Sequence, residues 1–233
     1  MRRSTPSALT TNAISKHEAD ARDRFDRWSQ ARTFLRLGTW LGYVQREVLS
    51  RIDWVHAERL LDVGCGSGLA VYEAARRLQL SGGGIACGCD ISEGMLRQRA
   101  QPAADLANAC FVAASAQSLP FKGELFDVAI CTAAFHHFPK PIDALQEVRR
   151  VLRPGGKLLI AETCRDRSIV TWIFDRLHRW FEKGHVQYYR MGQLYSLLRD
   201  AGFDQVELTE INPSYAETKK LARKVAIFSA TAP

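Results

Sequence analysis

Residues 61–69 read LDVGCGSGL, in which an apolar run leads through three alternating glycines into an amphipathic segment. The apolar run at 60–63 predicts a short buried strand, and the periodicity of 69–80 predicts a helix. Glycines in such a turn let the backbone and the N-terminus of a helix come close to a ligand. We therefore expect this turn to form one wall of a binding site.

The spacing of the glycines separates this turn from two common nucleotide-binding loops. A G-x-G-x-x-G dinucleotide loop would need a glycine at position 69, where the chain has Leu69. A phosphate-binding P-loop would need a Gly-Lys-Ser/Thr ending, and the turn has none. Asp62 directly precedes the glycines and indicates a cationic ligand rather than a pyrophosphate.

Strand-like and helix-like segments alternate on the C-terminal side of this turn. The pattern predicts strands at 84–90, 111–114, 126–132 and 157–162, and helices at 92–100 and 141–152. A helix at 192–200 then precedes two alternating segments, 203–211 and 224–231, that fit an antiparallel hairpin. Strands alternating with helices indicate right-handed βαβ units, so the predicted class is a doubly wound α/β fold with a mostly parallel sheet.

Asp90 ends the predicted second strand, roughly 20 residues after the glycine turn. Doubly wound folds place an acid there to bind the ribose hydroxyls of a nucleoside. The alternative is that Asp90 only places a negative charge at the N-terminus of the next helix, where Ser92 is the expected N-cap. The preceding glycine turn favours ribose binding.

Composition excludes several classes of protein. Hydrophobic residues make up 46% and charged residues 24%, as in soluble globular domains, which excludes wholesale disorder. No apolar run approaches the roughly 20 residues that cross a bilayer. The net charge of +7 favours anionic partners, but the basic residues are scattered. The six cysteines lie mostly in apolar runs, and they are Cys65, Cys87, Cys89, Cys110, Cys131 and Cys164. We therefore expect them to be buried, reduced thiols of a cytoplasmic protein. We expect no metal site.

Four segments in order resemble the class I S-adenosylmethionine-dependent methyltransferases, most closely their small-molecule branch of quinone and sterol methylases. They are LDVGCGSG at 61–68, CDIS at 89–92, SLPF at 118–121 with FDV at 126–128, and AFHHF at 134–138 with VLRPGGKL at 151–158. The resemblance implies a Rossmann-like, seven-stranded sheet with a C-terminal antiparallel hairpin. It also implies S-adenosylmethionine as cofactor, with S-adenosylhomocysteine as product.

The resemblance implies a domain organisation and a cofactor site. Residues 1–12 would be a flexible tail, 13–58 a helical cap and 59–233 the methyltransferase domain with an acceptor-lid insertion at 165–200; an organelle-targeting role for 1–17 is the alternative to a tail. Ser115 stands where the family often has an Asp that meets the adenine amino group, a departure that puts adenine recognition in doubt. The implied cofactor residues are Asp62, Gly64, Cys65, Gly66, Gly68, Asp90, Ile91, Ser115, Ala116, Gln117 and Thr132.

The implied acceptor site follows the fourth predicted strand. His136 and His137 would deprotonate or orient the acceptor, and the alternative is that the pair is loop architecture bonded to backbone. The aromatic stretch at 169–181 could line an apolar pocket, touch a membrane surface or pack on the core. The further pocket candidates, for each of which core packing is the alternative, are Phe25, Trp28, His185, Tyr188 and Tyr189.

The predicted function is direct methyl transfer to a small, apolar or aromatic metabolite, such as a quinone-like or natural-product acceptor. A nucleic-acid methyltransferase is one alternative, suggested by the charge. The segment TAAF at 132–135 argues against it, because amino-methylating DNA and RNA enzymes carry an Asn/Asp-Pro-Pro-aromatic sequence there. The other alternative is a cofactor-binding partner subunit without activity, which the Ser115 departure would allow.

Overall fold

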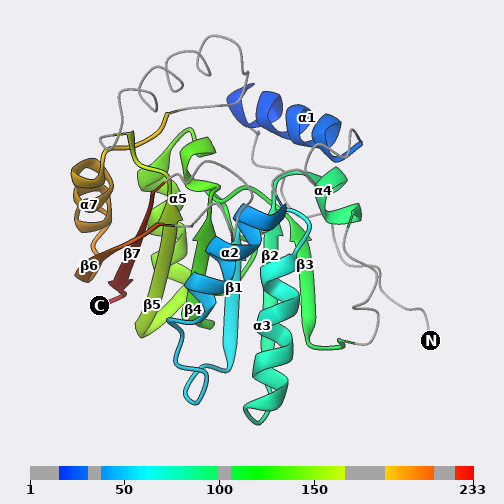
Figure 1. Cartoon of the computed structure of the whole chain (residues 1–233), viewed down its shortest axis with the longest axis vertical. Helices are drawn as coiled ribbons and strands as arrows, with labels where there is room; N and C mark the ends of the chain where they lie inside the picture. The colour runs from blue at the N-terminus through cyan, green and yellow to red at the C-terminus, as the bar shows by residue number, and fades with distance from the viewer. Residues whose placement is uncertain (1–15, 31–37, 99–105, 166–186, 213–223) are drawn as a thin grey trace.

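The computed structural model describes residues 16–30, 38–98, 106–165, 187–212 and 224–233. Its strands form a seven-stranded sheet in the order β3-β2-β1-β4-β5-β7-β6 (Figure 1). β1 (Arg59–Val63), β2 (Ile85–Asp90), β3 (Ala109–Ala113), β4 (Phe126–Thr132) and β5 (Leu152–Glu162) pair in parallel. β7 (Val225–Thr231) pairs antiparallel with both β5 and β6 (Asp204–Ile211). The predicted doubly wound α/β class with a C-terminal hairpin is confirmed.

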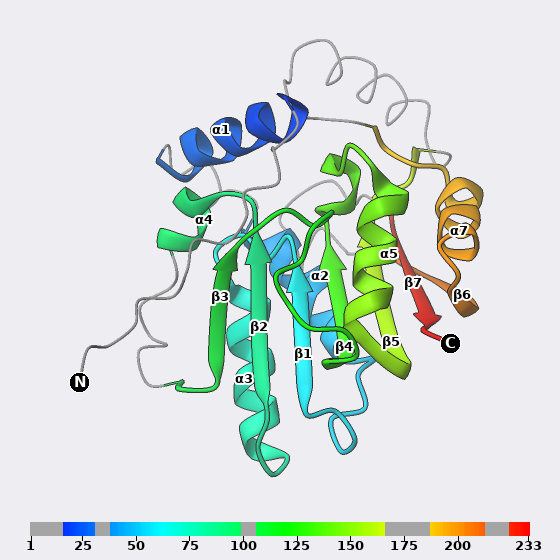
Figure 2. The same cartoon turned by 180° about the vertical axis from the view of Figure 1, so that it is seen from behind.

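Helices cover both faces of the sheet. α2 (Gly38–Leu49) and α3 (Leu69–Leu80) lie on the face toward the viewer in Figure 1, and α5 (Pro141–Val151) lies on the face shown in Figure 2. α7 (Met191–Asp200) packs on α5 and the hairpin. Each face has its own apolar core, because the central strands are buried on both sides.

The N-terminal helices have different positions. α2 packs on α3, β4 and β5, and Val44 and Val48 are fully buried there, so α2 belongs to the layer that covers the sheet. α1 (Lys16–Gln30) packs instead on α4 (Glu93–Arg97) and crosses the end of the sheet toward which β1–β4 point (Figure 2). Of the described residues in 13–58, those of α1 lie over this end of the sheet and those of α2 belong to the layer on its face.

The prediction of reduced thiols is wrong for two of the six cysteines. Cys87 and Cys110 form a disulfide, whereas Cys65, Cys89, Cys131 and Cys164 are buried and form no disulfide with a described residue. The parallel register of β2 and β3 places Cys87 directly opposite Cys110, with the Cα atoms 4.6 Å apart. The two sulfurs meet because β2 and β3 pair in this register. The sequence pattern does not determine the register of a strand pair, so it could not predict the disulfide.

Asp127 fastens the entry of β1 to β4. One carboxylate oxygen accepts hydrogen bonds from the backbone N–H of Glu58 at 2.6 Å and of Arg59 at 2.8 Å. The other oxygen lies 2.8 Å from the Arg153 guanidinium. Asp127 is buried at the amino end of β4, whereas α1 crosses the end toward which β4 points (Figure 2), so its contribution is to stability rather than to ligand binding.

We expect Asp127→Ala to lower the free energy of unfolding by about 2–3 kcal/mol, because two backbone N–H groups lose their acceptor. Denaturant titration measures this change, and the affinity for the cofactor should stay as in the wild type. Arg76→Ala is the control, since Arg76 is an exposed partner of Glu73 and its loss should cost within about 0.5 kcal/mol. A stability for Asp127→Ala equal to that of Arg76→Ala would contradict this role.

Candidate functional site

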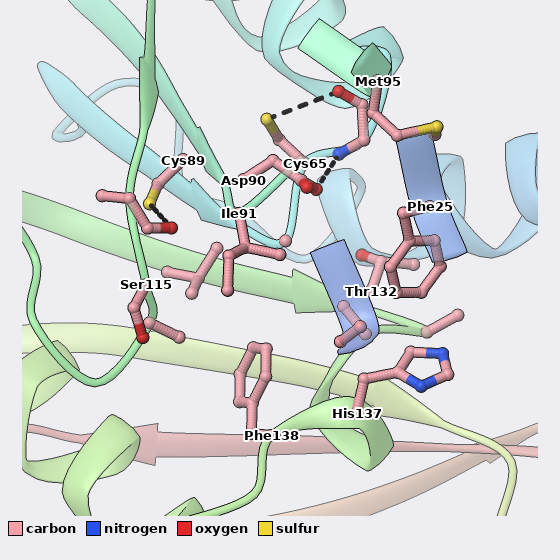
Figure 3. A pocket seen from close by; sticks show the side chains of 18 of the residues that line it. Phe25, Cys65, Cys89, Asp90, Ile91, Met95, Ser115, Thr132, His137 and Phe138 are labelled. Atoms are coloured by element: carbon pink, nitrogen blue, oxygen red, sulfur yellow. Dashed lines mark hydrogen bonds between the residues drawn. The ribbon is translucent and has the colours of Figure 1, made fainter. Parts of the chain in front are cut away.

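A cavity opens at the carboxyl ends of β1, β2 and β4, beneath α1 (Figure 3). The strand order reverses between β1 and β4, and doubly wound sheets bind ligands at such a point. The cavity therefore lies where the fold favours a ligand.

The glycine turn forms the floor of this cavity. Gly64, Gly66 and Gly68 have positive φ angles of 78°, 55° and 79°, which other residues rarely adopt. A Cβ at Gly64 would lie 2.5 Å from the Cβ of Ala134, and a Cβ at Gly68 would lie 2.4 Å from the Phe111 ring. Gly64 and Gly66 line the cavity, so backbone of the turn forms part of its wall.

Asp90 joins the turn to the end of β2. Its Oδ2 accepts a hydrogen bond from the N–H of Gly66 at 2.8 Å, and its Oδ1 accepts one from the N–H of Ser92 at 2.9 Å. A carboxylate can accept about four hydrogen bonds, so both oxygens retain capacity for ligand hydroxyls. Burial raises the pKa of the Asp90 carboxyl, and hydrogen bonds from Ser92 and Gly66 oppose that rise. The two roles predicted as alternatives for Asp90 are thus compatible.

Asp62 lies behind the turn rather than on the cavity wall. The residue is 2% exposed in β1, and burial, followed by the charge of Asp90, raises its pKa to about 8. A buried carboxyl with a raised pKa is mostly neutral at pH 7, and a nearby cation would favour its charged form. The role of Asp62 as a partner of a cationic ligand stays a prediction.

Ser115 and Gln117 meet a carboxylate from α1. Oε1 of Glu18 accepts hydrogen bonds from the Ser115 hydroxyl and from the Gln117 side-chain amide. The Ser115 oxygen also accepts the backbone N–H of Gln117 at 3.1 Å. Glu18 is 8% exposed and lines the same cavity as Asp90 and Ser115. The Glu18 carboxylate thus lies beside Ser115 in the cavity, at the place where the family often has an Asp.

The two histidines have different surroundings. His137 lines the cavity; Nη2 of Arg24 lies 3.4 Å from both of its ring nitrogens, and the Phe25 ring stands edge-on at 4.9 Å. His136 is buried behind it, with Nδ1 2.9 Å from Oε2 of Glu162 at the end of β5. Their rings are 3.9 Å apart. Glu162 thus fixes the ring of His136. The His136 ring lies against the His137 ring, which faces the cavity.

Most of the predicted site residues line one cavity in the structure. Further residues, which the sequence analysis did not predict, line it as well. The predicted residues on the cavity wall are Gly64, Cys65, Gly66, Asp90, Ile91, Ser115, Ala116, Gln117, Thr132, Phe25 and His137. Residues on the wall without a prediction include Glu18, Ala21, Leu41, Gln45, Met95 and Phe138. The α1 residues Glu18, Ala21 and Phe25 recur every three or four positions, and this helical spacing is the signal that could have found the first two.

Other predicted residues lie away from the described wall of the cavity. Gly68 caps α3 beneath the Phe111 ring, and Tyr188 packs on His136 with ring centroids 4.9 Å apart. Tyr189 packs on Phe135 and lines a separate surface hollow beside α7. The side chain of Trp28, residue His185 and the stretch 169–181 lie outside the described residues.

Two buried polar atoms support a ligand in this cavity. Oγ1 of Thr132 and Oε1 of Gln117 have no hydrogen-bond partner among the described residues, and both side chains line the cavity. Buried polar groups normally have partners, so a ligand with its own polar groups would satisfy them. Within the described ranges, no group of three His, Cys, Asp or Glu side chains could hold a metal ion.

Comparison with known proteins gives the family. Residues 61–160 match the methyltransferase domain family. The O-methyltransferase resE of Aspergillus sclerotiorum is 30% identical over 186 residues, which are 78% of this chain and 68% of that protein. The chain belongs to the S-adenosylmethionine-dependent methyltransferases.

The ubiquinone/menaquinone biosynthesis C-methyltransferase UbiE of Cereibacter sphaeroides is 34% identical over 132 residues, and this match covers 54% of the chain and only 52% of UbiE. A Haloferax volcanii methyltransferase solved with its activator Trm112 superposes with a TM-score of 0.74 at 21% identity, covering 90% of this chain and 97% of that chain. A methyltransferase from Thermotoga maritima gives a TM-score of 0.67 at 21% identity, covering 90% and 98%. These structures confirm the methyltransferase fold. Within the described residues, no helix is long and apolar enough to span a bilayer.

We expect Asp62→Asn to gain stability relative to the wild type by on the order of 3–4 kcal/mol as the pH rises from 5 to 8. The pKa of folded Asp62, about 8, lies above its unfolded value, so the wild type loses stability as pH rises through that window. Denaturant titration at both pH values measures the difference. Asp53→Asn, at an exposed site, is the control. A stability gain that stays constant between pH 5 and pH 8 would contradict the raised pKa.

Proposed function

We propose that this protein transfers the methyl group of S-adenosylmethionine to a small, largely apolar metabolite with an aromatic or quinone-like ring. The observation that carries the proposal is one cavity whose wall has both polar and apolar side chains. We call the part beside Asp90 and Ser115 its polar end and the part beside Phe25, Phe138 and His137 its apolar end; these residues are labelled in Figure 3.

The polar end fits the cofactor. Asp90 would accept the ribose hydroxyls and Ile91 would flank the adenine. The glycine turn and Thr132 would contact the methionine part, with Asp62 behind the turn as the counter-charge for its ammonium group. When bound, S-adenosylmethionine supplies a methyl group on a sulfonium sulfur, already activated for displacement. The protein then has to align the acceptor with that methyl and to exclude water.

The apolar end supports an acceptor with a ring. Leu41 of α2, Phe25 of α1, and Phe138 and Pro139 after β4 line it with carbon surface, which favours apolar ligands over charged ones. The names of relatives agree in kind, since UbiE is a C-methyltransferase of quinone biosynthesis and resE is an O-methyltransferase. An acidic or polymeric acceptor has no comparable support among the described residues.

His137 is the proposed base. Its ring is on the cavity wall at the apolar end, where a hydroxyl or carbon acid of the acceptor would lie. Glu162 holds Nδ1 of His136, and the His136 ring lies against His137, so the pair is fixed in orientation from behind. A base in that place would take the acceptor proton near the moment of methyl transfer.

The experiment that tests the function is a labelled-methyl screen. Purified protein with methyl-labelled S-adenosylmethionine is incubated with fractionated metabolite extracts, quinones and RNA, and mass spectrometry detects products that gain the label. Label in a small apolar compound supports the proposal. Label in RNA alone would favour the nucleic-acid alternative. Tight cofactor binding without any labelled product would favour a non-catalytic partner subunit.

We expect Asp90→Asn to weaken S-adenosylhomocysteine binding by about 100-fold, because charge-assisted hydrogen bonds to the ribose are lost. Asn keeps the shape and one acceptor oxygen, so the fold should remain, which circular dichroism checks. Calorimetric titration measures the affinity. Asp204→Asn, an exposed residue of β6, is the control. An Asp90→Asn affinity within twofold of the wild type would remove Asp90 from the cofactor site.

We expect His137→Asn to slow the methyl-transfer step by at least about 100-fold in single-turnover experiments with the acceptor from the screen. Cofactor affinity should stay within about twofold of the wild type. Glu162→Gln should slow the step less and shift its pH profile, because it acts through His136. His56→Asn is the control, since His56 is an exposed partner of Asp53. Full rates in both site variants would mean that the pair is only loop architecture.

A further inference from the structure

We infer that Glu18 of α1 recognises the exocyclic amino group of the cofactor's adenine, so that α1 supplies the carboxylate that position 115 lacks. The inference rests on the proposed cofactor site and adds the residue that determines its base specificity. It concerns a helix outside residues 61–160, the part that matches the methyltransferase domain family.

The position of Glu18 is the first argument. Its Oε1 accepts hydrogen bonds from Ser115 and Gln117, the residues that follow β3 at the polar end of the cavity. Glu18 is nearly buried and lines the cavity together with Ile91 and Ser115. A buried carboxylate needs hydrogen bonds to remain charged, and Ser115 and Gln117 each supply one to Glu18. A carboxylate of α1 therefore stands beside the segment that follows β3.

Hydrogen-bond capacity is the second argument. Ser115 and Gln117 both donate to Oε1 of Glu18, which makes this carboxylate a hydrogen-bond acceptor at the cavity wall. Oε1 of Gln117 is buried beside it and accepts none from the described residues. An exocyclic amine donates two hydrogens and accepts none. It could therefore donate one hydrogen to Glu18 and one to Gln117.

The same arrangement discriminates against related bases. A hypoxanthine ring has a carbonyl oxygen where adenine has the amine, and that oxygen would face the carboxylate of Glu18. Two acceptors without a hydrogen between them repel each other, and sites built for a donor reject ligands that lack it. Base specificity is therefore the property that separates recognition by Glu18 from a purely structural role.

The matched control is the second acidic anchor of α1. Oδ1 of Asp26 accepts the Ser92 hydroxyl at 2.5 Å and the N–H of Gly94 at 2.9 Å, which fastens α1 to α4. Asp26 is absent from the described wall of the cavity that holds Ser115. Loss of Asp26 weakens the docking of α1 without changing the groups that would face the base.

The experiment compares S-adenosylhomocysteine with S-inosylhomocysteine by calorimetric titration of the full chain. We expect the wild type to prefer the adenine ligand by at least about tenfold, and Glu18→Gln to reduce that preference to within about threefold. Asp26→Ala should weaken both ligands equally and keep the preference. The double variant Glu18→Gln/Ser115→Asp should regain it, because the carboxylate returns on the neighbouring element.

Equal weakening of both ligands by Glu18→Gln, with the preference intact, would overturn the inference and leave Glu18 as an anchor of α1 only. Melting temperatures establish that each variant is folded. If Glu18→Gln does not fold, a wild type that binds both ligands equally would overturn the inference, and Glu18→Asp with a reduced preference would support it. A wild type that binds neither ligand would instead overturn the proposed cofactor site, a result distinct from a lost preference.

Discussion

The close approach of the glycine turn to β4 and β2 is the constraint on which the rest of the site depends. Gly64 lies so near Ala134 that a single Cβ would collide, and the N–H groups of Gly64 and Cys65 both donate to the carbonyl of Cys89. The ends of three strands are thereby held around one cavity, whose wall includes bare backbone. The arrangement needs no side chain from the turn, because the backbone and the neighbouring carboxylates supply the polar groups.

Local sequence contained most of the fold. The predicted range of α3 agrees with the structure at both ends, as does that of β4, and Ser92 is the N-cap of α4 as expected. β5 begins at Leu152 rather than at the predicted residue 157, because α5 passes directly into a strand that is irregular where it first pairs with β4. Periodicity detects regular pairing and misses such irregular entries.

Most residues predicted for the cofactor lie on the cavity wall, because they follow successive strands and the carboxyl ends of parallel strands meet at one edge. The sequence could not give Glu18, Glu162 or the Cys87–Cys110 pair. Each depends on a contact between residues distant in sequence: a helix crossing the sheet edge, the end of β5 behind a histidine, and the register of two strands. Such contacts are determined by packing, which local patterns do not encode.

The inferred role of Glu18 offers a reason why the serine at position 115, a departure from the family pattern, need not mean loss of adenine recognition. Recognition requires a carboxylate at a place in space, and two elements border that place: the segment after β3 and helix α1. A carboxylate on α1 has a further consequence, because α1 must be docked for the adenine site to be complete. Binding of the nucleoside would then stabilise the docked position of α1, and docking of α1 would strengthen nucleoside binding by the same coupling free energy. Since α1 also holds Phe25 against His137, closure of the cofactor end would position the acceptor end as well.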